Sequence, residues 1–67
     1  MKRVFSSNVE QVGFDPTTHV LTVVYRTGRV VEYAGVPDNV GNSVVEAPSV
    51  GEALHNSIRG KYAFRYV

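Results

Sequence analysis

A β-hairpin with Gly28 in its turn constrains the fold of this chain more than any other feature. Residues 20–25 read Val-Leu-Thr-Val-Val-Tyr, and nearly all of them are β-branched or aromatic, as is typical of strands. Residues 29–34 predict the partner strand. A three-residue loop with Gly28 in the left-handed conformation pairs Tyr25 with Arg29. The side chains that then share one face of the sheet are Leu21, Val23, Tyr25, Val31 and Tyr33.

The other register would exchange the two faces of this hairpin. A two-residue Thr27-Gly28 loop fits less well, because type I′ turns favour Asn or Gly at the position that Thr27 occupies. In the preferred register the second face carries Val20, Thr22, Val24, Val30 and Glu32. Solvent-facing strand positions are usually polar. The three valines are therefore present either for their strand propensity, or because a terminus, a partner protein or a second copy of the chain covers them.

Two further segments predict extended structure. Residues 10–15 read as a strand that ends in a type I turn at Asp15-Pro16. Residues 61–66 alternate aromatic side chains with Lys, Ala and Arg, which predicts a last strand or an extended tail. Three consecutive strands joined by short turns form an antiparallel meander.

The region between the hairpin and this tail predicts two helices. Over residues 36–47, valines and an alanine recur at spacings of three or four, with Pro37 in the expected first turn and Pro48 ending the helix. Residues 49–52 form a capping box for the second helix, and Gly60 lies where that helix is expected to end. The expected fold class is α+β: a three-stranded antiparallel β-meander followed by two short helices and an extended, strand-like C-terminus. The predicted core is Phe14, Leu21, Val23, Tyr25, Val31, Tyr33, Val40, Val44, Leu54 and Ile58.

Length and composition exclude several classes of protein. A chain of 67 residues allows a single domain, expected over residues 1–67, and the lack of Cys excludes disulfides, thiol nucleophiles and cysteine zinc sites. No apolar run approaches the ~20 residues of a membrane span. No apolar segment of a secretory leader follows Lys2-Arg3. We therefore expect a cytoplasmic protein that does not contact a membrane.

The charges are segregated along the chain although the net charge is only +1. Cations cluster near the two ends, and residues 30–52 contain four acids and no Lys or Arg. If the ends lie close together, five cations share one surface. These are Lys2, Arg3, Arg59, Lys61 and Arg65.

Catalytic and metal-binding patterns are weak in this sequence. Ser6 or Ser7 could be drawn into a triad with Asp15 and one of the two histidines, His19 and His55, but no nucleophile elbow accompanies them. The histidines and carboxylates have no recognisable metal spacing, and no phosphate-binding loop is present. We predict no enzyme activity, no catalytic or metal-binding residue, no cofactor and no small-molecule substrate.

The sequence resembles the KTSC family, a short domain that occurs alone in bacterial and phage proteins and at the C-terminus of some lysyl-tRNA synthetases. The matching elements are Ser6-Ser7, Val12-Gly13-Phe14-Asp15, Leu21-x-Val23-x-Tyr25-x-x-Gly28-x-x-Val31-x-Tyr33, Val36-Pro37, Ala47-x-Ser49-x-Gly51, Ile58-Arg59 and Tyr62. The central Tyr-x-Tyr of the family appears here as Val31-Glu32-Tyr33, so its first Tyr is missing. Leu54 stands where the family tends to carry Phe. The resemblance implies a domain without an established activity, for which RNA binding has been suggested.

Two binding functions follow as hypotheses. The first is a protein-interaction or self-association module with an interface at Val20, Val24 and Val30, and the nearly neutral net charge favours it. The alternative is an RNA-binding accessory domain, in which cations contact phosphates and tyrosines stack on unpaired bases. Its expected residues are Arg59, Lys61, Tyr62, Arg65 and Tyr66, extended by Arg26 and Arg29 beside the hairpin turn. The competing interpretation of Tyr62, Phe64 and Tyr66 is that they cover a small core.

Overall fold

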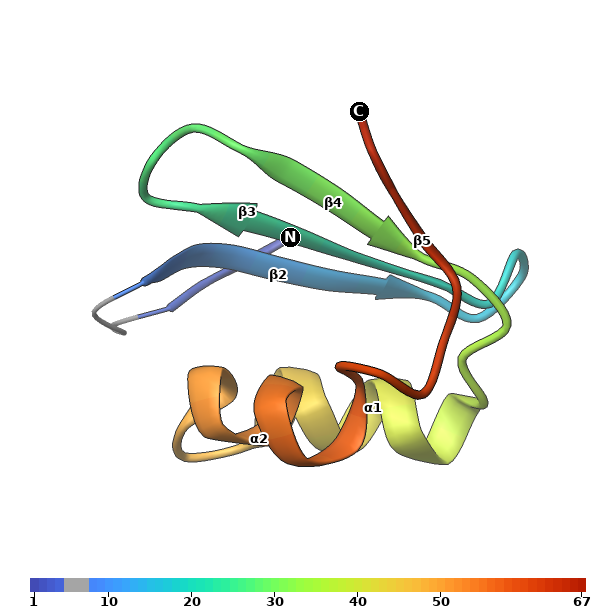
Figure 1. Cartoon of the computed structure of the whole chain (residues 1–67). Coiled ribbons are helices and arrows are strands. Elements are labelled where there is room, and N and C mark those ends of the chain that lie inside the picture. Colours follow the sequence, from blue (N-terminus) through green and yellow to red (C-terminus); the bar gives the residue numbers. More distant parts are fainter. Residues whose placement is uncertain (5–7) are drawn as a thin grey trace.

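The computed structural model describes residues 1–4 and 8–67, which form an antiparallel sheet with two helices on one of its faces (Figure 1). The strands are β1 (Lys2–Arg3), β2 (Val9–Asp15), β3 (Val20–Tyr25), β4 (Val30–Tyr33) and β5 (Phe64–Tyr66). The helices are α1 (Asp38–Glu46) and α2 (Val50–Ser57). The strands lie in the sheet in chain order, from β1 to β5. The α+β class is confirmed.

The β3–β4 hairpin has the predicted three-residue loop. Val23 pairs with Val31 and Val24 with Val30. The Tyr25 amide donates to the Arg29 carbonyl at 2.8 Å, and Gly28 has the left-handed φ of 92° that the bulged turn requires. Leu21, Val23, Val31 and Tyr33 are all buried, so the odd-numbered side chains of the hairpin face the helices as expected.

The sheet has more strands than the sequence indicated. β5 pairs antiparallel with β4, which confirms the strand-like C-terminus. β1 was not predicted, because two charged residues have no alternation to reveal a strand; it forms only through pairing with β2, Lys2 opposite Val12 and Arg3 opposite Gln11. β1 and β5 are the two edges of the sheet. Lys2 and Arg3 on β1 are therefore separated from Arg65 on β5 by three strands.

The helices begin and end close to the predicted positions. α1 starts at Asp38, with Pro37 just before it as N-cap, and it ends before Pro48. The Ser49 hydroxyl accepts the Glu52 amide at 3.4 Å, as the capping box predicts, and Gly60 follows α2 with a φ of 77°. The loop between β2 and β3 extends through His19, whose amide donates to the Asp15 carbonyl at 2.8 Å. Within the described residues, neither helix is long and apolar enough to cross a membrane.

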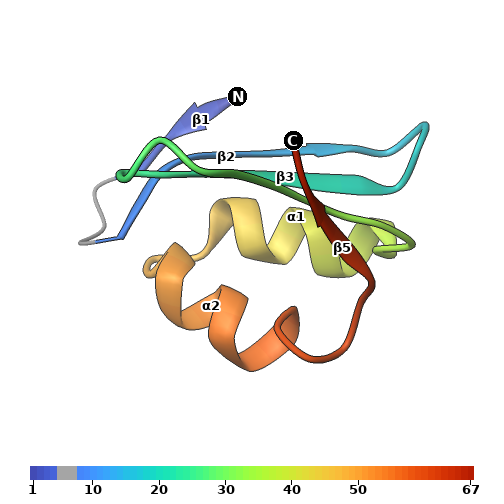
Figure 2. The same ribbon diagram turned by 45° about the horizontal axis from the view of Figure 1, so that its top comes forward.

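The core lies between the sheet and the helices, and the other face of the sheet has no helix over it (Figures 1 and 2). Phe14, Tyr25 and Val40 of the predicted core are only partly buried and pack against the core. The buried apolar residues are Val4, Val9, Val12, Leu21, Val23, Val31, Tyr33, Val36, Val44, Val50, Leu54 and Ile58. Val4, Val9, Val12, Val36 and Val50 were not in the predicted core.

Candidate functional site

A cleft of about 690 Å³ opens between the β3–β4 hairpin, the end of α2 and β5. The residues that define its chemistry are Tyr25, Arg29, Tyr33, Arg59, Phe64 and Tyr66, and we call it the arginine–tyrosine cleft. Among the described residues that line it, none is acidic. The cleft therefore combines aromatic surface with positive charge, a composition that suits a planar anionic ligand.

Strand pairing explains how the aromatic residues reach one wall of the cleft. Tyr33 of β4 lies opposite Phe64 of β5, and Val31 lies opposite Tyr66, so alternation directs all four side chains to the face that carries the helices. The Tyr33 and Phe64 ring centroids are 5.9 Å apart, and those of Phe64 and Tyr66 are 5.7 Å apart at 78°. Phe64 is 57% exposed and Tyr66 is 59% exposed, because the helices do not extend under β5. Both rings thus expose part of their surface to the cleft.

Arg29 lies over one of these rings. Its guanidinium carbon is 4.6 Å from the centroid of Tyr66, which is cation–π distance. Because the partner in this contact is the face of the Tyr66 ring and not a hydrogen-bond acceptor, the N–H donors of Arg29 remain for other partners. Arg29 thus approaches the cleft from the hairpin side.

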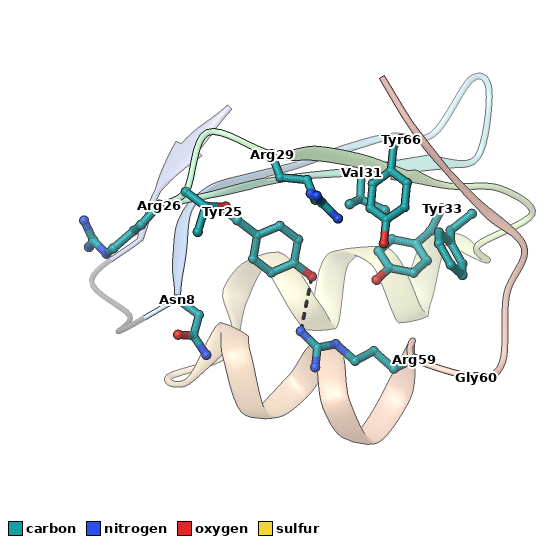
Figure 3. Close-up of a pocket in the computed structure, with 11 residues that line it drawn as sticks. Asn8, Tyr25, Arg26, Arg29, Val31, Tyr33, Arg59, Gly60 and Tyr66 are labelled. Carbon is teal, nitrogen blue, oxygen red and sulfur yellow. Dashed lines mark hydrogen bonds between the residues drawn. The ribbon is translucent and has the colours of Figure 1, made fainter.

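Arg59 approaches the same cleft from the end of α2 (Figure 3). Its Nη2 donates to the Tyr25 hydroxyl at 3.3 Å. This hydrogen bond is the main cause that raises the pKa of Arg59. Burial, followed by the interaction with Tyr25, raises the pKa of Tyr33 to about 12, so this phenol stays neutral at physiological pH. The hydrogen-bond partner of Arg59 is thus a neutral hydroxyl, which does not neutralise the positive charge of the guanidinium.

The structure brings four of the seven expected RNA-contacting residues to the cleft: Arg26, Arg29, Arg59 and Tyr66. Arg26 is at the rim. Its side chain points away from the cleft and donates to the Val4 carbonyl at 3.3 Å (Figure 3).

The other three expected residues lie elsewhere. Arg65 alternates to the opposite face of β5, where its Nε and Nη2 both donate to Glu32 Oε1 at 2.9 Å. The Lys61 ammonium donates to the Asn56 carbonyl at 2.9 Å. Tyr62 is half-buried and packs against the core, in line with the competing interpretation of this residue.

The predicted protein interface lies on the face of the sheet without helices. Val20, Val24 and Val30 are half-buried there, and Val24 and Val30 are cross-strand neighbours. Contact between them accounts for part of their burial. Val24 and Val30 form a partly exposed apolar pair, and Val20 lies at the other end of β3.

The described residues of the hypothetical triad make separate contacts. His19 Nε2 lies 3.3 Å from Asp38 Oδ1 at the surface, His55 is exposed on α2, and Asp15 Oδ1 accepts a hydrogen bond from the Thr17 amide. Ser6 and Ser7 lie outside the described residues. In residues 1–4 and 8–67 no three potential metal ligands are grouped.

Sequence reasoning did not assign Tyr25, Tyr33 and Phe64 to the site. The two tyrosines were assigned to the core from their strand alternation, and Phe64 was grouped with the aromatic residues that follow α2. A usable signal was present: Phe64 and Tyr66 are two residues apart, as side chains on one face of a strand are.

Comparison with known proteins gives matches over most of the chain. The KTSC domain family model matches residues 5–62. The lysine–tRNA ligase of Nostoc punctiforme is 34% identical over 58 residues, which cover 87% of this chain and 10% of the ligase. An uncharacterised protein of Stutzerimonas stutzeri is 32% identical over 68 residues, which cover 98% of this chain and 94% of that protein. The crystal structure of a KTSC domain protein from Yersinia pestis matches with a TM-score of 0.91 at 29% identity, covering 98% of this chain and 93% of that one.

Proposed function

This chain belongs to the KTSC domain family, and from that premise we propose that it is an RNA-binding module whose arginine–tyrosine cleft contacts unpaired nucleotides. The domain occurs both in lysine–tRNA ligases, of which this chain spans about a tenth, and in proteins that it almost fills. A ligase of that name acts on tRNA, which makes RNA the ligand to consider first. The proposal places no catalytic group, cofactor or metal in the cleft.

The observation that carries the proposal is the pairing of exposed rings with unneutralised guanidinium groups in one cleft. Stacking of an unpaired base on an aromatic side chain contributes ~1–3 kcal/mol, and Phe64 and Tyr66 both present exposed rings. The ion pairs among the described residues are His19–Asp38 and Arg65–Glu32, so neither Arg29 nor Arg59 is paired with a carboxylate. Both are thus available to phosphates.

The low net charge sets the expected strength and salt dependence of binding. A net charge of +1 gives little general attraction for nucleic acid, so binding depends on the cleft. If Arg29 and Arg59 neutralise two phosphate charges of a single strand, the slope of log K against log salt is about −1.4. A much steeper slope would indicate a wider basic surface than the cleft supplies.

Fluorescence anisotropy with a short single-stranded RNA, titrated at several salt concentrations, tests the proposal. We expect Arg59→Gln and Tyr66→Ala each to weaken binding by about tenfold or more, since each removes a phosphate or stacking contact worth ~1–3 kcal/mol. Arg65→Gln is the matched control. It removes one arginine charge, as Arg59→Gln does, but Arg65 is next to Tyr66 in β5 and faces the other side of the sheet. Far-UV circular dichroism verifies that each variant is folded.

The proposal is overturned if the parent protein fails to bind at low salt. It is also overturned if Arg65→Gln weakens binding as much as Arg59→Gln, because the contact would then not depend on the cleft.

Protein interaction or self-association through Val20, Val24 and Val30 is the second candidate. The observation in its favour is that no helix covers this face of the sheet (Figure 2). We rank it second because the three valines are already half-buried, and because the Arg65–Glu32 ion pair lies on the same face.

A further inference from the structure

We propose that the arginine–tyrosine cleft binds the phosphorylated end of an RNA strand, with the terminal phosphate between Arg29 and Arg59 and the terminal base against the exposed aromatic pair of Phe64 and Tyr66. This inference rests on the proposed function and specifies its ligand. The ligand class is a single-stranded RNA that carries a phosphomonoester at its 5′ or 3′ end.

The first argument is the charge at the mouth of the cleft. Arg29 and Arg59 come from different elements and enter the cleft from opposite sides (Figure 3). An internal phosphodiester carries one negative charge, whereas a phosphomonoester carries about 1.5 to 2 at neutral pH and presents three acceptor oxygens. Two guanidinium groups, each able to donate two parallel hydrogen bonds, match the monoester better.

The second argument is that both guanidinium groups are held in place before a ligand arrives. Arg59 donates to the Tyr25 hydroxyl, and Arg29 lies 4.6 Å from the centre of the Tyr66 ring. Fixing these long side chains in advance lowers the conformational entropy that binding would otherwise cost. The partner is a hydroxyl in one contact and an aromatic ring in the other, so no carboxylate in these contacts competes with a phosphate for the two guanidinium groups.

The third argument is the depth and size of the cleft. Its floor is formed by Val31 and Tyr33, which are 3% and 5% exposed, and the core lies beneath them. The cleft therefore ends at the core and does not pass through the domain. Its volume of about 690 Å³ is within the range of small-molecule sites and suits about one nucleotide. A strand end enters such a cleft more easily than the middle of a chain.

The test compares one short RNA sequence in four forms: 5′-phosphorylated, 3′-phosphorylated, hydroxyl at both ends, and circular. Each form carries the same internal fluorophore, and binding is measured by anisotropy at about pH 7.5. We expect one phosphorylated form to bind about tenfold more tightly than the dihydroxyl form. The circular form should bind no better than the dihydroxyl form.

Two further readouts locate the effect. The preference for the phosphorylated form should shrink at about pH 5.5, since the second pKa of a phosphomonoester is about 6. Arg29→Gln and Arg59→Gln should each reduce the preference to about that of the dihydroxyl form, whereas Arg65→Gln, on the opposite face, should preserve it.

The outcomes separate the two proposals. Equal binding of all four forms overturns the end-specific inference and leaves RNA binding standing. No binding of any form overturns RNA binding itself. A phosphate preference that survives Arg29→Gln and Arg59→Gln overturns the placement in this cleft.

Discussion

Replacing Gly41 with Ala should destabilise this domain, although Ala is the better helix former. Gly41 is buried in α1 beneath Phe14 of β2, and a Cβ atom there would lie 2.3, 2.5 and 2.6 Å from the ring atoms Cδ1, Cγ and Cε1. Carbon atoms in contact are normally about 3.5 Å apart, so the ring must move by about 1 Å. Overpacking of this kind costs ~1–3 kcal/mol, and the gain in helix propensity is ~1 kcal/mol. We therefore expect a net loss of about 1 kcal/mol.

A double-mutant cycle with Phe14→Ala isolates the contact. Without the Phe14 ring only the propensity term remains, so Gly41→Ala should stabilise that background by ~1 kcal/mol. Asn42→Ala is the matched control, because Asn42 is exposed in the same helix. This substitution should stabilise the parent and the Phe14→Ala variant alike, by a few tenths of a kcal/mol. Urea unfolding followed by far-UV circular dichroism gives the four free energies.

The reasoning is refuted if Gly41→Ala stabilises the parent as much as the Phe14→Ala variant. The ring would then accommodate the methyl group without cost. A domain of this size has only ~3–5 kcal/mol of stability, so all variants are measured in trimethylamine N-oxide if Phe14→Ala proves too unstable.

Three further predictions concern stability and the outer face of the sheet. The free energy of unfolding should fall as the pH rises from 10 to about 12, because the folded state holds the Tyr33 proton more tightly than the unfolded chain does. Tyr33→Phe should make the free energy of unfolding less dependent on pH in this range. If the alkaline unfolding curve of Tyr33→Phe equals that of the parent, the burial of the phenol is contradicted. Leu54→Ala should cost ~2–5 kcal/mol, since Leu54 is 0% exposed, and a thermal melt equal to that of the parent would be incompatible with its place in the core. Val24→Asp should abolish any self-association while the domain stays folded, and sedimentation at two protein concentrations measures this. A parent protein that is monomeric at both concentrations removes the homodimer candidate. If Val24→Asp does not fold, this face of the sheet belongs to the core.

The hairpin and the site differ in how far the sequence could predict them. The three-residue loop followed from Gly28 and the poor fit of Thr27, both of which act within the hairpin itself. The sequence indicated that arginines and tyrosines near the hairpin turn and the C-terminal segment bind a ligand, and it grouped Arg65 with them, although Arg65 lies on the other face of the sheet. Alternation in residues 61–66 already directs Arg65 away from Phe64 and Tyr66. Which of the two sets faces the helices depends on the register with β4, and three residues of β5 do not encode that register.

Local patterns also predicted where side chains point better than how deeply they are buried. Phe14 and Tyr25 face the helices as their alternation requires, yet they are only partly buried, because the depth of burial depends on the neighbours that the tertiary structure places over each side chain. β1 shows the opposite limit: two charged residues become a strand only because β2 supplies the partner groups.

By itself the sequence determined the α+β class, the register of the hairpin, the helix boundaries and the chemistry available for binding. These depend on periodicity, turn residues and caps that act over a few neighbouring positions. Only the tertiary structure decided that Arg59, 30 residues after Arg29, reaches the same cleft, and that β1 and β5 lie at opposite edges of the sheet. The physical reason is that strand pairing and layer packing join residues that are distant in the chain, and no local pattern encodes those distances.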